Sequence, residues 1–118
     1  HFREAVNAVA YLAERAPEAG VFEAVEYLNV NAPLPPDAGS VPMEITRPSE
    51  GYQMGAERDG DTIEITDGIW AQMADGTVPD PAGTDRRAVL EGRVSVSPLS
   101  PQHSLVDDSA LDGLAETY

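Results

Sequence analysis

A short strand-forming segment, closed off by prolines, is the feature that most constrains the fold of this 118-residue chain. Residues 27–31 read Tyr-Leu-Asn-Val-Asn, and Pro33, Pro35 and Pro36 prevent the strand from continuing. Residues 2–16 carry apolar side chains at spacings of three and four, which predicts an amphipathic helix that ends before Pro17. A helix followed by such a run is typical of an α/β unit whose strand is buried on both faces and has parallel neighbours.

The remainder of the chain divides by composition into a middle and a last part. Residues 32–40 form a proline-rich connector, and strands are predicted at residues 41–47, 52–57, 62–66 and 69–73, with a turn at residues 58–61. Thr84 or Asp85 should cap a short helix that stops at Gly92, and residues 93–97 alternate as a half-buried strand ended by Pro98. A last helix, capped within residues 107–109, carries Leu111 and Leu114.

Charge and composition exclude several functional classes. The chain has 21 acidic residues against 7 basic ones, all Arg, so its net charge is −14, which disfavours nucleic acid and anionic membrane as partners. Dispersed acid without lysine indicates a halophile's cytoplasmic protein; the alternative is codon bias in a GC-rich genome. The absence of cysteine removes disulfides and thiolate sites. No apolar run is long enough to span a membrane.

The candidate chemical motifs each have a simpler structural explanation. Asp59-Gly60-Asp61 with Glu64 suggests a calcium loop, but it lacks the twelve-residue ligand spacing, so a hairpin turn is favoured. Arg86 and Arg87 beside Thr84 could bind a phosphate, or they could form a solvated helix face or a subunit salt bridge. His1 and His103 are the only imidazoles. These patterns indicate an α/β piece without naming an activity.

Three stretches, taken in order and spacing, resemble the C-terminal half of the SurE survival-protein family. They are Leu-Asn-Val-Asn-Ala-Pro at residues 28–33, Ile-Thr-Arg at 45–47 with Tyr52 five residues on, and the run from Gly-Thr-Asp at 83–85 to Ser-Val-Ser-Pro-Leu at 95–99. The match extends over about residues 25–115. The family's usual threonine in the last motif is Ser97 here, and an aromatic after the glycine is Arg93. Because the chain opens in a helical pattern without Met, we expect it to be part of a longer protein.

The resemblance implies a metal-dependent phosphatase, or nucleotidase, that hydrolyses nucleoside monophosphates. It implies that residues 1–31 end a Rossmann-like parallel sheet, that residues 32–82 hold the connector and a protruding β-hairpin, and that residues 83–118 are exchanged between subunits of a dimer or tetramer. The family's divalent metal site lies on N-terminal motifs that do not occur here, so no catalytic or metal residue is carried over. The expected partner is an upstream catalytic half of the same protein.

Candidate site residues follow from the same resemblance. Asn31, Thr84 and Asp85 are the residues expected near the substrate. The residues expected to contribute to assembly are Tyr52, Trp70, Leu111 and Leu114. The competing hypothesis is a stand-alone acidic binding or scaffolding module without catalytic activity. An aspartate-aspartate-glycine motif upstream would separate the two hypotheses.

Overall fold

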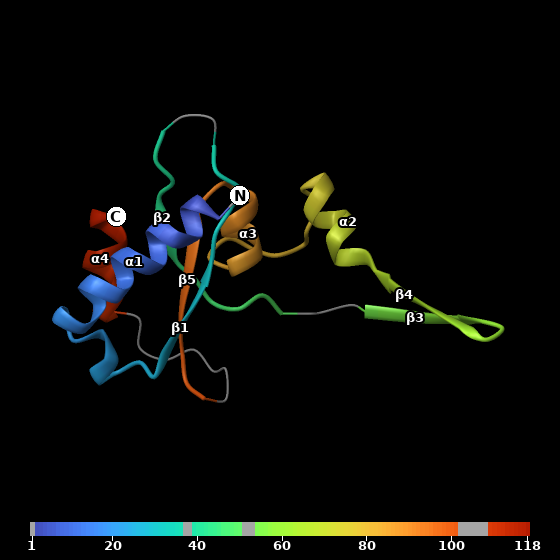
Figure 1. Ribbon diagram of the computed structural model, residues 1–118, viewed down its shortest axis with the longest axis horizontal. Coiled ribbons are helices and arrows are strands. Elements are labelled where there is room, and N and C mark those ends of the chain that lie inside the picture. The colour runs from blue at the N-terminus through green and yellow to red at the C-terminus, as the bar shows by residue number, and fades with distance from the viewer. Residues whose placement is uncertain (1, 37–38, 51–53, 102–108) are drawn as a thin grey trace.

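The computed structural model describes residues 2–36, 39–50, 54–101 and 109–118. Helices pack on a three-stranded sheet, and a two-stranded hairpin extends away from it (Figure 1). The elements in chain order are α1 (Arg3–Glu18), the 3₁₀ helix η1 (Val21–Glu23), β1 (Tyr27–Asn31), β2 (Met43–Ile45), β3 (Met54–Asp59), β4 (Thr62–Asp67), α2 (Gly68–Asp75), α3 (Asp85–Leu90), β5 (Val94–Leu99), the 3₁₀ helix η2 (Ser109–Leu111) and α4 (Asp112–Thr117). The predicted α/β class, with a separate hairpin and a C-terminal helix, is confirmed.

Helix α1 forms where the spacing of apolar residues predicts it. Its buried side is spaced by four residues and includes Ala8, Leu12 and Ala16, which lie against the sheet. The prediction that the helix ends before Pro17 is wrong, because the helix continues to Glu18. Proline removes only one backbone donor, and the helix instead stops ahead of Gly20, whose φ of 71° suits glycine.

The three-stranded sheet has the order β1-β5-β2, with both kinds of pairing. Strand β1 is antiparallel to β5, in a register that opposes Asn29 to Ser97, while β2 is parallel to β5. The predicted burial of β1 on both faces is not seen in this chain, and the parallel neighbours of β1, which were expected to lie outside this chain, stay a prediction. Within the described residues β1 lies at the sheet edge, is half-buried along its length and pairs with an antiparallel strand.

Strand β5 occupies the centre of the sheet and is fully buried. Val94 and Val96 join the hydrophobic core, while Ser95 and Ser97 alternate with them and share the hydroxyl of Thr46, each at 2.8 Å. The predicted half-buried strand ending before Pro98 is wrong on both points. The alternating polar residues are buried with hydrogen-bond partners, and proline fits because β2 extends only to the position opposite Val96.

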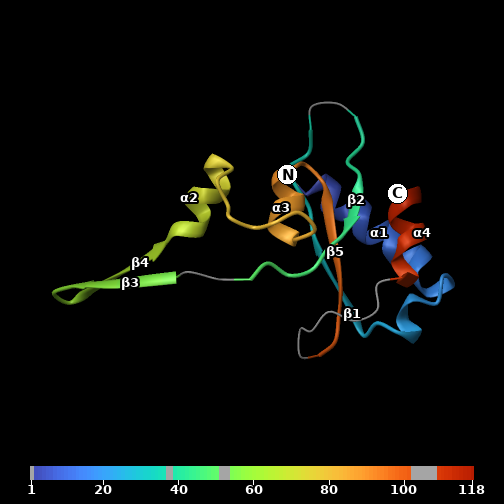
Figure 2. The same ribbon diagram turned by 180° about the vertical axis from the view of Figure 1, so that it is seen from behind.

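The core lies between α1 and the sheet, and the C-terminal helix completes it. In Figure 1 α1 lies in front of β2, and in Figure 2 it lies behind, so it covers one face of the sheet. Helix α4 contacts β2 and α1. The buried apolar residues that pack together in this core are Ala8, Leu12, Ala16, Val21, Val25, Val41, Met43, Val94, Val96 and Leu111. No helix within the described ranges combines the length and the apolar character needed to cross a membrane.

The hairpin and α2, residues 54–75, form an arm that projects from this core (Figure 2). Strands β3 and β4 pair antiparallel and turn at Gly60, whose φ is 60°, so the predicted hairpin turn is confirmed. The strand expected at residues 69–73 is wrong, because this segment belongs to α2. Ile69 and Trp70 favour strands, but Ala71, Gln72 and Met73 favour helices, and the helical preference prevails.

Candidate functional site

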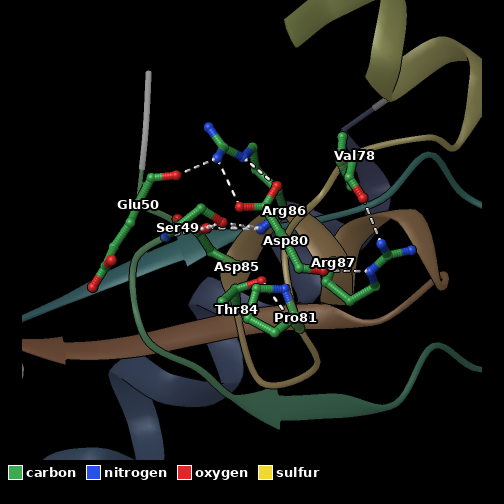
Figure 3. A network of polar contacts seen from close by, with 9 residues as sticks. All are labelled: Ser49, Glu50, Val78, Asp80, Pro81, Thr84, Asp85, Arg86 and Arg87. Atoms are coloured by element: carbon green, nitrogen blue, oxygen red, sulfur yellow. Dashed lines mark hydrogen bonds and ion pairs between the residues drawn. The ribbon is translucent and has the colours of Figure 1, made fainter. Parts of the chain in front are cut away.

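Two adjacent arginines at the start of α3 hold the preceding loop in place (Figure 3). Arg86 donates two hydrogen bonds to the Asp80 carboxylate, from Nε to Oδ2 at 2.8 Å and from Nη2 to Oδ1 at 2.7 Å. Its Nη2 also donates to the backbone oxygen of Glu50 at 3.0 Å. Arg87 donates to the backbone oxygens of Asp80 and Val78, at 3.0 and 2.6 Å. Both side chains engage this chain's own loop, so the prediction of a solvated helix face is wrong.

The start of α3 is fastened to the segment that follows β2. Asp85 Oδ1 accepts hydrogen bonds from the backbone N–H of Ser49 at 2.9 Å, from the Ser49 hydroxyl, and from the backbone N–H of Arg86 at 2.7 Å. Thr84 occupies the predicted cap position with extended backbone, but its hydroxyl donates to the Pro81 carbonyl at 2.8 Å and does not cap the helix. The aspartate, rather than the threonine, supplies the acceptor for a free helix N–H.

The Asp80 carboxylate is the most perturbed acid in this network. Its side chain is 3% exposed and that of Arg86 is 17% exposed. The hydrogen bonds and charge of Arg86 hold the pKa of Asp80 below its ordinary value, against the opposing effect of burial; Ser49 and Arg87 lower this pKa further. Asp80 is therefore ionised at neutral pH, and its charge is neutralised by an arginine of the same chain.

A hollow of about 440 Å³ lies beside this network, between α1, the end of β1, α2 and α3. Two of the residues expected near the substrate, Asn31 and Asp85, line it together with Arg86. Trp70, which is 67% exposed, lies on the same lining. The other lining residues are Phe2, Ala5, Val30, Ala32, Ile69, Met73 and Val89. The hollow thus combines an aromatic and aliphatic wall with an amide, a carboxylate and a guanidinium, a combination that suits a ligand with an apolar ring and polar substituents.

The third substrate-proximal candidate lies apart from the other two. Thr84 is 2% exposed and borders a smaller hollow of about 170 Å³ with Arg47, Glu50 and Asp80. The structure therefore brings Asn31 and Asp85 to one hollow and places Thr84 at another.

The assembly candidates fall in three different environments. Trp70 lies exposed on the arm, whereas Leu111 is 1% exposed in the hydrophobic core of this same chain. Leu114 is half-buried against that core, and its backbone oxygen accepts a hydrogen bond from the Tyr11 hydroxyl at 3.2 Å. Tyr52 lies outside the described residues. Exchange of the last segment between subunits stays a prediction.

The carboxylates of this region do not suit a divalent cation. Both oxygens of Asp80 meet the Arg86 guanidinium, and Asp85 Oδ1 accepts three hydrogen bonds. A bound cation would have to displace Arg86 and would face its positive charge. Across the described ranges, no group of three or more His, Asp or Glu side chains is arranged to hold a metal ion.

Sequence reasoning missed the residues that anchor the network to its surroundings. Asp80 lies between Pro79 and Pro81 in a segment read as loop, and Ser49 lies after Pro48 in a connector. The one available signal was an acid isolated in a proline-rich loop a few residues before two arginines. The contact of Ser49 with Asp85 joins residues 36 apart, which no local pattern reveals.

Comparison with known proteins shows strong similarity to proteins named 5'-nucleotidase SurE. The chain is 62% identical over 117 residues to the one from Natronomonas pharaonis, 55% identical over 117 residues to that of Haloarcula marismortui, and 48% identical over 118 residues to that of Haloquadratum walsbyi. Each match covers 99% of this chain. The predicted resemblance to the SurE family is confirmed, and these relatives come from halophilic archaea, as the acidic, lysine-free composition indicates.

The matched region is only part of each relative. The chain spans 46%, 43% and 44% of the lengths of these three curated relatives, which is consistent with one half of such a protein. No family model matches the chain, and no solved structure matches it either.

Proposed function

We propose, from the resemblance to SurE, that this chain is the C-terminal, assembly-forming half of a metal-dependent nucleotidase that hydrolyses nucleoside monophosphates to nucleoside and phosphate. The observation that carries the proposal is the 62% identity to a protein named 5'-nucleotidase SurE over 99% of this chain. The match covers 99% of this chain and so includes both the core and the arm, which supports the proposal. The proposed location of the whole protein is the cytoplasm.

The substrate-binding part of the proposal rests on the hollow beside α3. Asn31 and Asp85 line it, and Trp70 provides an aromatic surface on which a planar base could stack. The amide of Asn31 offers both donors and acceptors to a base or ribose. We propose that this hollow lies at the nucleoside end of the substrate, because Arg86 is already paired with Asp80 and offers little to a phosphate.

The metal-binding part of the proposal is assigned to the rest of the polypeptide. A divalent cation would supply a Lewis acid and an activated water to the hydrolysis. The carboxylates of this chain near the hollow are committed to Arg86 and Ser49, so the ligands are proposed to lie in the other half. This chain's own residues would then shape the nucleoside end and the subunit contacts.

The assembly part of the proposal rests on the exposed arm. Ile63 and Ile65 are 67% and 65% exposed on β4, two residues apart and hence on one face of the hairpin. These two side chains form an apolar surface on the arm that a second subunit would cover. We propose a homo-oligomer, a dimer or a tetramer, in which these arms contact neighbouring subunits.

The test is an assay of two polypeptides under the same conditions. The full-length protein, in concentrated KCl with Mn²⁺ or Mg²⁺, should release phosphate from nucleoside monophosphates such as AMP, and this chain alone should not. Turnover by this chain alone at an ordinary phosphatase rate would contradict the proposal that the metal ligands lie in the other half of the polypeptide. A full-length protein without phosphatase activity would favour the acidic scaffolding module instead.

A further inference from the structure

The hollow beside α3 has one wall from the core and one wall from the arm. Asn31 at the end of β1 and Asp85 at the start of α3 belong to the core wall. The arm wall consists of Ile69, Trp70 and Met73 of α2. Ile69 and Met73 are four residues apart and therefore share one side of this helix. The width of the hollow depends on where α2 is held with respect to the core.

Contacts inside the arm do not set the position of α2 against the core. Helix α2 packs against β3, which belongs to the arm, and the arm strands pair with no core strand of the described residues. Ile69 is 8% exposed, but apolar burial is non-directional and leaves the distance between α2 and Asn31 open. The loop of residues 76–84, which leads from α2 to α3, is the segment that can fix this distance.

Arg87 of α3 holds this loop by its backbone (Figure 3). Its Nη2 donates to the carbonyl of Val78 at 2.6 Å, and its Nε donates to the carbonyl of Asp80 at 3.0 Å. Val78 is also buried, at 3% exposed. Because the guanidinium is planar and rigid, two bonds from it fix both the place and the orientation of the loop backbone.

The segment that Arg87 holds continues directly into α2. The N–H of Thr77, the residue before Val78, donates to the carbonyl of Gln72 in α2 at 2.9 Å. Trp70 precedes Gln72 by two residues on the same helix. Covalent bonds and hydrogen bonds therefore form a continuous connection from Arg87 on α3, through the loop, to the helix that carries Trp70.

We propose that Arg87 is a positioning residue for nucleoside binding, because it holds α2, and with it Trp70, at the separation from Asn31 that admits a planar base. Trp70 is 67% exposed although it lines the hollow, so most of the indole surface is available to a ligand. The amide of Asn31 on the other wall offers donors and acceptors to the base. This assignment rests on the proposed nucleotidase function of the whole protein. It makes the hollow selective for phosphate esters that carry a base.

Arg86, the neighbouring arginine, has a different part in the network. Arg86 pairs with the buried carboxylate of Asp80 and also lines the hollow, so its removal would leave a buried charge unpaired as well as free the loop. Arg87 binds backbone carbonyls of the loop and is not one of the described residues that line the hollow. A change at Arg87 therefore reaches the base only through the loop and α2.

Steady-state kinetics of the full-length protein, in concentrated KCl with Mn²⁺, tests the role of Arg87 with two substrates. Ribose 5-phosphate has the sugar and phosphate of AMP but no base. We expect Arg87→Ala to raise KM for AMP about tenfold, through loss of base stacking, while kcat for AMP and both constants for ribose 5-phosphate change less than about twofold. Equal increases in KM for both substrates, or no increase for AMP, would overturn the proposal.

Two further variants complete this comparison. Arg87→Lys should raise KM for AMP by less than Arg87→Ala, because an ammonium group cannot hold both carbonyls in the geometry of a guanidinium. It also supplies the test if Arg87→Ala fails to fold. Arg93→Ala is the matched control, since Arg93 pairs with Glu44 and Glu91 at the surface, and it should change neither substrate's KM.

A double variant tests whether Arg87 acts through the indole. Trp70→Ala alone should raise KM for AMP, and Trp70→Ala combined with Arg87→Ala should raise it no further than the larger single effect, because both changes remove the same stacking contact. If the two effects multiplied in the double variant, Arg87 would act independently of Trp70 and the proposal would be wrong.

Binding of adenosine separates the role of Arg87 from the proposed enzymatic function. Trp70 is the one tryptophan of this chain. Its fluorescence, taken as the difference between the full-length protein and the Trp70→Phe variant, should change on addition of adenosine, and Arg87→Ala should weaken adenosine binding about tenfold. Such binding in a protein without phosphatase activity would contradict the proposed function and support the role of Arg87. Phosphatase activity with adenosine binding unaltered in Arg87→Ala would contradict the role of Arg87 alone.

Discussion

The core and the arm are made from the same acidic, aliphatic chain, yet they differ in what holds them together. In the core, all six residues of β5 are buried, and the strand pairs with β1 along one edge and with β2 along the other. In the arm, β3 and β4 pair with each other and with no further strand of the described residues, and Ile63 and Ile65 of β4 remain more than half exposed. A two-stranded hairpin is marginal in water by itself. The comparison shows that regular hydrogen bonding is common to both regions, whereas most of the buried apolar side chains lie in the core and the arm buries Ile69 of α2.

The network of Asp80, Arg86 and Ser49 joins the two regions. Asp80 lies on the loop that returns from α2, and Arg86 lies on α3, which packs against β5. Ser49 lies on the segment that leads from β2 toward the arm and binds Asp85. Both chain crossings between core and arm are therefore fastened at the start of α3, which makes this network the joint of the molecule.

The largest expected effect comes from breaking the joint. Arg86→Ala leaves the Asp80 carboxylate buried without its partner, and loss of one member of a buried pair costs about 3–5 kcal/mol. We expect this loss in the free energy of unfolding measured with urea in concentrated KCl. Arg93→Ala is the matched control, since Arg93 pairs with Glu44 and Glu91 at the surface, and it should leave stability unchanged. If both variants lowered the free energy of unfolding equally, the buried pair of Arg86 and Asp80 would contribute no more to stability than a surface ion pair.

The next effect separates core from arm directly. Leu12→Ala removes a side chain that is 4% exposed and should cost about 2–5 kcal/mol. Ile65→Ala removes one that is 65% exposed and should change stability by less than about 0.5 kcal/mol. In the full-length protein, light scattering should show a smaller oligomer for Ile65→Ala only. If Ile65→Ala instead caused a large loss in the free energy of unfolding without changing the oligomer size, the arm would pack on its own subunit.

Acid should loosen the joint with less effect than removing Arg86. The pKa of Asp80 is lowered in the folded state, so its contribution is complete above the unfolded value of about 3.9 and is lost as the pH falls through the lower folded value. Unfolding free energy, followed by urea titration from pH 6 downward, should therefore decline in this window. Asp80→Asn should make that decline shallower. If the unfolding free energy of Asp80→Asn fell with pH as steeply as that of the unchanged protein, the decline could not be attributed to Asp80.

The smallest effect concerns like charges on the arm. Glu57 and Glu64 are directly opposite one another on β3 and β4, and such pairs destabilise a hairpin by a few tenths of a kcal/mol. Added KCl should screen them, so amide exchange in the hairpin should slow between 0.1 M and 2 M salt by more than exchange in β5. Glu64→Gln should reduce this salt dependence, with Asp75→Asn on α2 as the control. A salt response equal in both variants would assign the effect to the whole acidic surface.

Sequence reasoning succeeded where the deciding residues are close neighbours. The apolar spacing of α1 was sufficient to predict the helix, because residues three and four apart share a helix face, although Phe2, Val6 and Val9 of that pattern are exposed. The turn at Gly60 was also correct, since a two-residue hairpin loop depends on the residue that accepts a positive φ. The SurE resemblance followed from short motifs whose order the chain preserves. Asn31 and Asp85 came from that resemblance, and the structure places both at one hollow.

What only the tertiary structure decided are the relations between distant segments. Local alternation in β5 indicated a half-exposed strand, but Thr46, 49 residues from Ser95, supplies the hydroxyl that allows the serines to be buried. The direction and edge position of β1 depend on β5, and the joint depends on a proline-flanked aspartate meeting Arg86. The physical reason is range: helix periodicity and turn geometry arise from neighbouring residues, while strand partners and buried polar pairs are selected by which distant groups can satisfy one another without water.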